Sequence, residues 1–225
     1  MTALARRTMQ LLVMVAVQGV VLFVSAGTFR WPAGWLYVAL YAGTVAVAAA
    51  VLVPWHREVV EERSRGRAGG AAWDRYLTTA QAVSLLGILA LAGLNERWGW
   101  QPRLPAGLAV LGVALFVLGY AVVVWAMAAN PFFSQVVRIQ TERGHSVVSN
   151  GPYRVVRHPG YAGLSLSALG AVLLLGSVWA LLPWSGYVAL TVLRTSREDS
   201  MLARELAGYR EYQARTRRRL LPAIW

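Results

Sequence analysis

The sequence contains no cysteine, which excludes a disulfide framework, a thiolate nucleophile and any metal site with cysteine ligands. Histidine is scarce as well: His56, His145 and His158 lie far apart and show no spacing typical of metal ligands. The chain also lacks a glycine-rich phosphate-binding fingerprint after a strand and a serine in a nucleophile elbow. These absences argue against P-loop enzymes and serine hydrolases, and we expect no metal site.

Acidic residues are few, with 10 in the chain, and lysine is absent, since all 22 basic residues are arginine. The formal charge of +12 suits nucleic acid binding, an anionic membrane surface or a topology signal. Apart from Arg30, Arg97 and Arg103, the arginines lie at the N-terminus, in 54–76, in 130–159 and in the C-terminal tail. Arginine-rich loops of membrane proteins stay in the cytoplasm. The charge therefore favours a topology with both termini and 130–159 cytoplasmic, and no nucleic acid partner.

Long uncharged hydrophobic runs dominate the chain, and hydrophobic residues make up 57% of its 225 positions. A run of about 18 residues or more is long enough to span a bilayer as a helix. The first run could also be a secretory signal, but further runs follow at once, which favours a membrane span. We expect four spans, at residues 9–26, 33–53, 77–94 and 106–129.

Residues 160–193 form a still longer uncharged run. One continuous helix of this length would measure about 51 Å, against roughly 30 Å for the hydrocarbon core of a bilayer. Gly176 lies midway and Pro183 follows, so the run must break near its centre. We expect a tight hairpin of two helices, 160–175 and 178–193, which returns the chain to the side where it started.

Beyond the hairpin, Arg194, Glu198, Leu202 and Leu206 recur every four residues, which places them on one face of an amphipathic helix. Gly208 is expected to interrupt this helix. The predicted fold is all-α: a polytopic membrane helix bundle with four spans, a C-terminal helical hairpin and an amphipathic C-terminal helix. No second folded domain or internal repeat is apparent.

Two charged segments carry no chemistry in this interpretation. The 54–76 loop mixes both signs of charge with small residues, and we expect a solvated connector at the membrane interface. The arginine run 217–219 is expected to contact anionic lipid headgroups.

The segment 151–161, Gly-Pro-Tyr-Arg-Val-Val-Arg-His-Pro-Gly-Tyr, brings polar residues to the start of the hairpin, after a polar strip at 130–148. Non-helical backbone at a membrane must be buried in protein or line a cavity, because lipid cannot satisfy its hydrogen bonds. Pro159 suits the first turn of a helix, so His158 would stand at a helix N-terminus, where free N–H groups can bind an anionic or carbonyl group. The alternative is that His158 only caps its own helix. This segment is the candidate site.

These residues carry a specific resemblance over the C-terminal half of the chain, while the first four spans match only as generic membrane helices. In order and spacing, the half from residue 130 resembles the isoprenylcysteine carboxyl methyltransferase family and, more broadly, phospholipid N-methyltransferases. The matching positions are Gln140, Gly144-His145, Val147-Val148, Gly151-Pro152-Tyr153, Arg157-His158-Pro159, Tyr161, Arg194, Glu198-Asp199 and Leu202.

The resemblance implies a membrane methyltransferase that takes its methyl group from S-adenosylmethionine and an apolar acceptor from the bilayer. Residues 1–129 would be the spans, and residues 130–225 the cofactor-binding catalytic half of one integrated domain. Arg194 and Glu198 would be the catalytic residues, with Arg194 directed at the acceptor. The implied cofactor-binding residues are Gln140, His145, Ser146, Val147, Val148, Tyr153, His158, Pro159, Gly160, Tyr161 and Glu198.

The chemistry of the residues agrees with this assignment at two points. Arg194 and Glu198 are four residues apart, so both can face one cleft. A carboxylate such as Glu198 would attract the sulfonium and ammonium groups of S-adenosylmethionine. The carboxylate of the cofactor could be held by a helix N-terminus or by Arg157. The alternative for Arg194 and Glu198 is an intrahelical salt bridge at the interface.

The match departs from the family at the acceptor side. Glu198-Asp199 stands where the family has paired glutamates, and the family's Gly-x-x-Tyr pattern is shortened to Gly208-Tyr209. The acceptor therefore stays open between a prenylated carboxylate, a phospholipid amine, a small thiol and other lipophilic carboxylates. A sterol-reductase-like enzyme that uses NADPH shares the Arg-His-Pro motif, but its following acid is absent from 160–163. A non-catalytic membrane transporter or scaffold is the third alternative.

Overall fold

The fold is a bundle of helices, seen in a computed structural model that describes residues 2–66, 69–222 and 225. Within these residues no β-strand forms, and the helices bear out the predicted all-α membrane bundle. Four of them, α1, α2, α4 and α5, are long and apolar enough to cross a membrane. The helices are α1 (Ala3–Ala26), α2 (Pro32–Trp55), α3 (Arg57–Ser64), α4 (Ala72–Trp98), α5 (Leu108–Ala129), α6 (Pro159–Leu175), α7 (Leu181–Glu205) and α8 (Tyr209–Arg215), with 3-10 helices η1 (Thr141–Arg143) and η2 (Gly151–Arg154).

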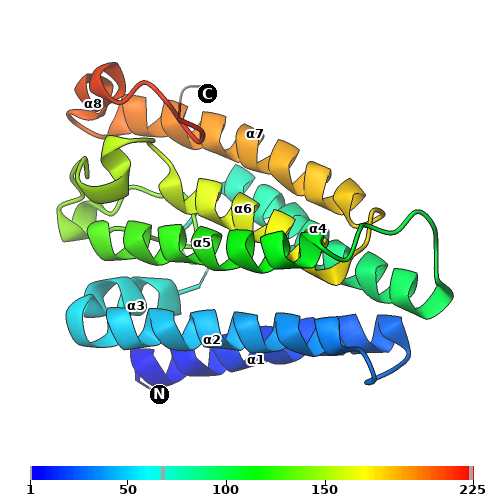
Figure 1. Cartoon of the computed structure of the whole chain (residues 1–225). Coiled ribbons are helices and arrows are strands. Elements are labelled where there is room, and N and C mark those ends of the chain that lie inside the picture. The colour runs from blue at the N-terminus through cyan, green and yellow to red at the C-terminus, as the bar shows by residue number, and fades with distance from the viewer. Residues whose placement is uncertain (1, 67–68, 223–224) are drawn as a thin grey trace.

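The helices run nearly parallel or antiparallel to one another, with α1 and α2 along one side and α7 along the other (Figure 1). Helices α5 and α6 fill the middle, and α4 lies against both α1 and α7. The start of α1, helix α3, the strip between α5 and α6, and α8 all gather at one end of the bundle (Figure 1). The arginine-rich segments therefore share one end, as the alternation of arginines predicts.

The C-terminal hairpin forms, but its second arm differs from the prediction. Gly176 ends α6 with a positive φ of 72°, a conformation that favours glycine, and so provides the predicted break. The second arm, α7, then runs without interruption from Leu181 to Glu205. The expected separate helices, 178–193 and an amphipathic successor, are thus one helix, because no glycine or proline interrupts the chain between them. A single rigid helix links the membrane-embedded hairpin to the charged residues at its end.

Helices α5 and α6 are in closest contact, and glycines make this approach possible. A Cβ atom added to Gly112 would lie 2.4 Å from the backbone nitrogen of Leu174, and one added to Gly170 would lie 2.4 Å from that of Phe116. Small residues that let two backbones approach are typical of helix contacts in membranes. The start of α6, which carries the candidate motif, is therefore held rigidly against α5.

A Gly170→Ala substitution should destabilise the protein strongly, by about 3 kcal/mol or more, because the new methyl group meets backbone rather than a movable side chain. Gly43→Ala in α2 is the matched control, since nothing lies within 4 Å of its Cβ position. Thermal unfolding of the detergent-purified variants checks the difference. Equal melting temperatures for the two variants would contradict the close contact.

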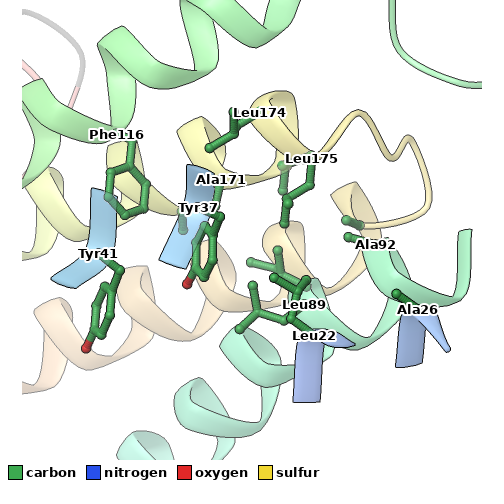
Figure 2. Close-up of a cluster of buried hydrophobic side chains, with 14 of the residues drawn as sticks. Leu22, Ala26, Tyr37, Tyr41, Leu89, Ala92, Phe116, Ala171, Leu174 and Leu175 are labelled. Carbon is green, nitrogen blue, oxygen red and sulfur yellow. The ribbon is translucent and has the colours of Figure 1, made fainter. Parts of the chain in front are cut away.

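A hydrophobic core fills the middle of the bundle, with members from α1, α2, α4, α5, α6 and α7. Tyr37 and Tyr41 project from α2 next to Phe116 of α5, and the leucines of α1, α4 and α6 close the other side (Figure 2). The labelled members are Leu22, Ala26, Tyr37, Tyr41, Leu89, Ala92, Phe116, Ala171, Leu174 and Leu175. This core fixes the hairpin against the N-terminal spans.

The 54–76 segment is not the solvated connector expected from its mixed charges. It folds into α3 and the first turn of α4, and it buries two acids, Glu62 at 4% exposure and Asp74 at 0%. Glu62 accepts two hydrogen bonds from the guanidinium of Arg138, at 3.0 and 2.9 Å. The prediction is wrong because the partners of these acids lie far away in sequence, in the polar strip and in α7.

Candidate functional site

A cavity lies where the polar strip, the start of α6 and the end of α7 meet. Phe132, Phe133 and Leu202 line it together with residues that the sequence singled out. The space it encloses is about 110 Å³. The predicted site residues that line it are His145, Ser146, Val147, Val148, Tyr153, His158, Gly160, Tyr161 and Glu198.

Three predicted site residues do not line this cavity, namely Gln140, Pro159 and Arg194. Gln140 is buried, donates to the backbone oxygen of Phe132 at 2.6 Å and accepts from Arg143 at 2.6 Å, so it supports the fold of the strip. Pro159 begins α6 and is buried behind the motif. Arg194 lies one helical turn deeper than Glu198. The structure thus brings together most of the predicted set.

Glu198 presents its carboxylate to the cavity from α7. Its Oε2 accepts a hydrogen bond of 2.5 Å from the hydroxyl of Tyr161 and lies 4.0 Å from Nδ1 of His158. The glutamate side chain is 21% exposed, and within the described residues no arginine pairs with it. His158 and Glu198, separated by the whole hairpin in sequence, therefore meet at one cavity with a carboxylate left accessible.

Asp199, the next residue, points away from the cavity opening and gathers positive partners. Arg157 binds its two oxygens at 2.8 and 2.6 Å, and His158 Nε2 lies 3.2 Å from Oδ1. The hydroxyl of Tyr209 donates to the same carboxylate at 2.8 Å, and Nε of Arg219 donates at 3.0 Å. Arg157 is thus held by Asp199 through Nε and Nη2, and its Nη1 donates to the backbone oxygen of Thr216 at 2.7 Å.

The side chain of His158 does not cap its own helix, because no capping hydrogen bond forms at this position. It binds Asp199 instead. The backbone N–H groups of Arg157 and His158 donate to the carbonyl oxygens of Arg218 and Arg219, both at 2.9 Å. The tail therefore holds the motif in place. Of the three arginines expected at lipid headgroups, Arg219 is occupied by Asp199, while Arg217 and Arg218 are exposed.

Arg194 pairs with Asp74 of α4, at 2.7 Å from Nε and 3.1 Å from Nη2. Its Nη2 also donates to the backbone oxygen of Gln135 at 3.0 Å. The guanidinium carbon lies 4.9 Å from the ring centroid of Tyr161, so Arg194 supports the residue that binds Glu198. The alternative of an intrahelical salt bridge to Glu198 does not occur among the described residues.

Asp74 is a residue that the sequence interpretation missed. Its Oδ2 also accepts the backbone N–H of Val137 at 2.9 Å, so one carboxylate joins α4, α7 and the strip. The signal was present: an acid three residues before an uncharged run lies at the edge of the membrane, where an ionised group needs a partner.

His145 lines the cavity, and its ring is tilted by 34° against the ring of Phe132, with 4.5 Å between the ring centroids. Its Nδ1 accepts the backbone N–H of Gln140 at 3.3 Å. Burial, followed by the positive charges of Arg138 and Arg143, lowers the pKa of His145 below its usual range. The lowered pKa favours the neutral ring, whose Nδ1 accepts this hydrogen bond.

Comparison with known proteins agrees with the resemblance seen in the sequence. Residues 108–207 match the family model for phospholipid methyltransferase. A probable protein-S-isoprenylcysteine O-methyltransferase of Oryza sativa subsp. indica is 33% identical over 66 residues, 29% of this chain and 35% of the relative. Protein-S-isoprenylcysteine O-methyltransferases A and B of Arabidopsis thaliana are 28% and 26% identical over 105 and 107 residues, in both cases 45% of this chain and 50% of the relative. The chain thus spans half or less of the length of the curated relatives that it matches.

Proposed function

We propose that this chain, a membrane protein with a methyltransferase-family segment related to the isoprenylcysteine and phospholipid methyltransferases, transfers a methyl group from S-adenosylmethionine to a lipophilic acceptor. The observation that carries the proposal is the accessible carboxylate of Glu198 in the cavity formed by the motif. The residues that match the family come from both arms of the hairpin and from the strip, and most of them line this cavity.

The residues present fit such a cofactor in charge and in the apolar character of the lining. Glu198 would attract the ammonium or sulfonium group, since charge-assisted hydrogen bonds and ion pairs strengthen away from water. Val147, Leu202 and Leu206 offer an apolar wall for the nucleoside part. Gly160 is required at the start of α6, because a Cβ there would lie 2.8 Å from the Phe133 ring. Pockets for small molecules usually measure about 300–1,000 Å³, so we infer that the cavity of about 110 Å³ widens when the cofactor binds.

S-adenosylmethionine supplies an electrophilic methyl group on a positively charged sulfur. The residues of this chain then need to orient the donor, exclude water and admit the acceptor in line with the methyl group. Orientation of two reactants can contribute about 7–11 kcal/mol to lowering the barrier. Tyr161 fixes the carboxylate of Glu198, and Arg194 fixes the ring of Tyr161, so the geometry is set by packed side chains.

We further propose that the cavity and both termini face the cytoplasm. The arginine-rich segments lie at the same end of the bundle as the cavity, and the positive-inside rule assigns that end to the cytoplasm. A water-soluble cofactor is available there, while the apolar helices give a lipophilic acceptor access from the bilayer.

Calorimetric titration of the detergent-purified chain with S-adenosylmethionine, S-adenosylhomocysteine and NADPH tests the proposal. We expect both adenosyl compounds to bind and NADPH not to bind. Glu198→Gln keeps the shape and the hydrogen bond to Tyr161 but removes the charge, and it should weaken S-adenosylmethionine binding roughly 10- to 100-fold.

Glu205→Gln is the matched control, because Glu205 ends the same helix and is exposed. It should bind both compounds like the parent. Selective binding of NADPH would favour a reductase instead, and an unchanged affinity in Glu198→Gln would remove the role assigned to this carboxylate.

A further inference from the structure

A second, larger cavity of about 500 Å³ lies among the membrane helices, between the N-terminal spans and the middle of the bundle. Its walls are mostly apolar and come from α1, α2, α4 and α5, with a few residues of α3, α6 and α7. Phe133 of the polar strip lines this cavity and the cofactor cavity alike. One aromatic ring therefore separates an apolar space of ligand size from the proposed methyl donor.

Two arginines from the N-terminal half, Arg7 and Arg63, line the same apolar cavity. Arg7 donates a hydrogen bond to the neutral side chain of Gln10. The guanidinium of Arg63 stands 5.4 Å from the ring centroid of Phe133 and, within the described residues, makes no hydrogen bond or ion pair. Within the described residues, neither Arg7 nor Arg63 pairs with a carboxylate, whereas other arginines of this chain do.

Arg63 is half-buried, and its guanidinium has no acidic partner within the described residues. Burial lowers the pKa of its guanidinium, and the positive charges of Arg7 and Arg194 lower it further. Arginine nevertheless stays protonated in proteins. A partly buried charge without a counter-ion at a membrane is unfavourable, and such residues in membrane proteins mark binding sites for ligands of opposite charge.

We propose that this cavity is the acceptor site and that Arg63, assisted by Arg7, selects an acceptor with an anionic headgroup. The apolar walls would hold one hydrocarbon chain, and the carboxylate or phosphate group would lie on Arg63 beside Phe133. An amine headgroup would meet two positive charges and be rejected. The assignment of the ligand as acceptor rests on the proposed methyltransferase function, whereas the anion site stands on Arg7, Arg63 and the cavity alone.

Arg63 and Arg7 are specificity residues that belong to the N-terminal half, outside the segment matched by the methyltransferase family model. Arg63 ends up beside the site because α3 contacts α1 and because Gln135 of the strip donates to the backbone oxygen of Arg63 at 2.7 Å. The same ring of Phe133 packs at the Cβ position of Gly160, at the start of α6. The headgroup on Arg63 would thus lie next to the motif that faces the methyl donor.

Binding of tritiated palmitate, hexadecyl phosphate and hexadecylamine to the full chain in phosphatidylcholine nanodiscs tests the inference. These probes share one chain length and differ in the headgroup. We expect the two anions to bind and the amine to bind at least about tenfold more weakly. The tighter of the two anions identifies whether the site prefers a carboxylate or a phosphate.

Arg63→Gln should lower the affinity for the preferred anion by about tenfold or more, and Arg63→Lys should retain part of it. Arg57→Gln is the matched control, since Arg57 begins the same helix and is exposed. Affinity for S-adenosylhomocysteine should stay unchanged in Arg63→Gln, which shows that the variant folds.

Two results would overturn the inference: equal binding of the amine and the anions, or anion binding that Arg63→Gln leaves intact. The two proposals fail separately. If S-adenosylhomocysteine does not bind the parent while palmitate binding still depends on Arg63, the methyltransferase proposal falls and the anion site stands. If S-adenosylhomocysteine binds and Arg63 has no effect on palmitate, only the anion site falls.

Discussion

Asp199→Ala is expected to lose about 3–5 kcal/mol of stability and with it cofactor binding, because it leaves the positive partners of a buried carboxylate uncompensated. Arg157, His158 and Arg219 all direct a nitrogen at this carboxylate, and only Arg219 is substantially exposed. Without the Asp199 carboxylate, the loop before α6 and the C-terminal tail would separate. Thermal unfolding and binding of S-adenosylhomocysteine measure the two effects.

The matched control for Asp199→Ala is Glu211→Ala, which removes an exposed acid from α8 nearby and should change stability by no more than about 0.5 kcal/mol. A loss in Asp199→Ala as small as that in Glu211→Ala would show that the carboxylate does not hold the site together. An intact fold with lost binding would instead point to direct contact between Asp199 and the cofactor.

The pH dependence of stability gives a second measurement on Asp199. Burial by itself raises the pKa of this carboxyl, but hydrogen bonds from His158, Arg157 and Arg219 outweigh it and hold the pKa well below its usual range. Its stabilising contribution is therefore complete above the unfolded pKa of about 3.9 and is lost as the pH falls below that value. Between about pH 5 and pH 3 the parent should lose more stability than Asp199→Asn, whose amide does not titrate.

Arg194→Ala and Asp74→Ala should each destabilise the protein by about 3–5 kcal/mol, because each leaves a buried charge without its partner. The double substitution should destabilise the protein by about 0.5–3 kcal/mol less than the sum of the two single substitutions. The second substitution removes the charge that the first leaves without a partner. Thermal unfolding of all four proteins completes the cycle. Strict additivity would show that the pair at 2.7 Å does not interact energetically.

Arg197→Ala is the control for this cycle, because Arg197 lies on the same helix, is exposed and has its guanidinium carbon 5.7 Å from the ring centroid of Trp73. It should cost less than about 1 kcal/mol. If the control behaves so, the loss of methyl transfer that we expect in Arg194→Ala can be attributed to the contacts of Arg194. Removing Arg194 frees Tyr161 and, through it, the carboxylate of Glu198, so the cofactor affinity should fall together with acceptor turnover.

We therefore propose a positioning role for Arg194, which lies behind Tyr161 and does not line the cavity. The resemblance assigns this arginine to the acceptor. If Arg194 acts only on the acceptor, Arg194→Ala should reduce turnover and leave S-adenosylhomocysteine affinity intact. The same titrations that test Glu198 decide between these roles.

The sequence by itself determined the fold class and indicated the candidate site. Uncharged runs of membrane-spanning length leave few alternatives to helices, since every backbone group must be satisfied inside the segment. Gly176 and Gly208 marked real helix ends, because each takes a positive φ that other residues avoid. The motif at 151–161 and Glu198 were recognisable as local patterns of residues with chemistry at a membrane edge. These features depend on neighbours in the chain, so they can be read from it.

Only the tertiary structure decided which charges meet. Asp74 and Arg194 are 120 positions apart, Glu62 and Arg138 are 76 apart, and no local pattern links either pair. The same holds for Phe133, whose ring lies between two cavities, and for Arg63, whose lack of a partner is visible only once its surroundings are known. Ion pairing depends on distance through space and on exclusion of water, and both are set by how the helices pack.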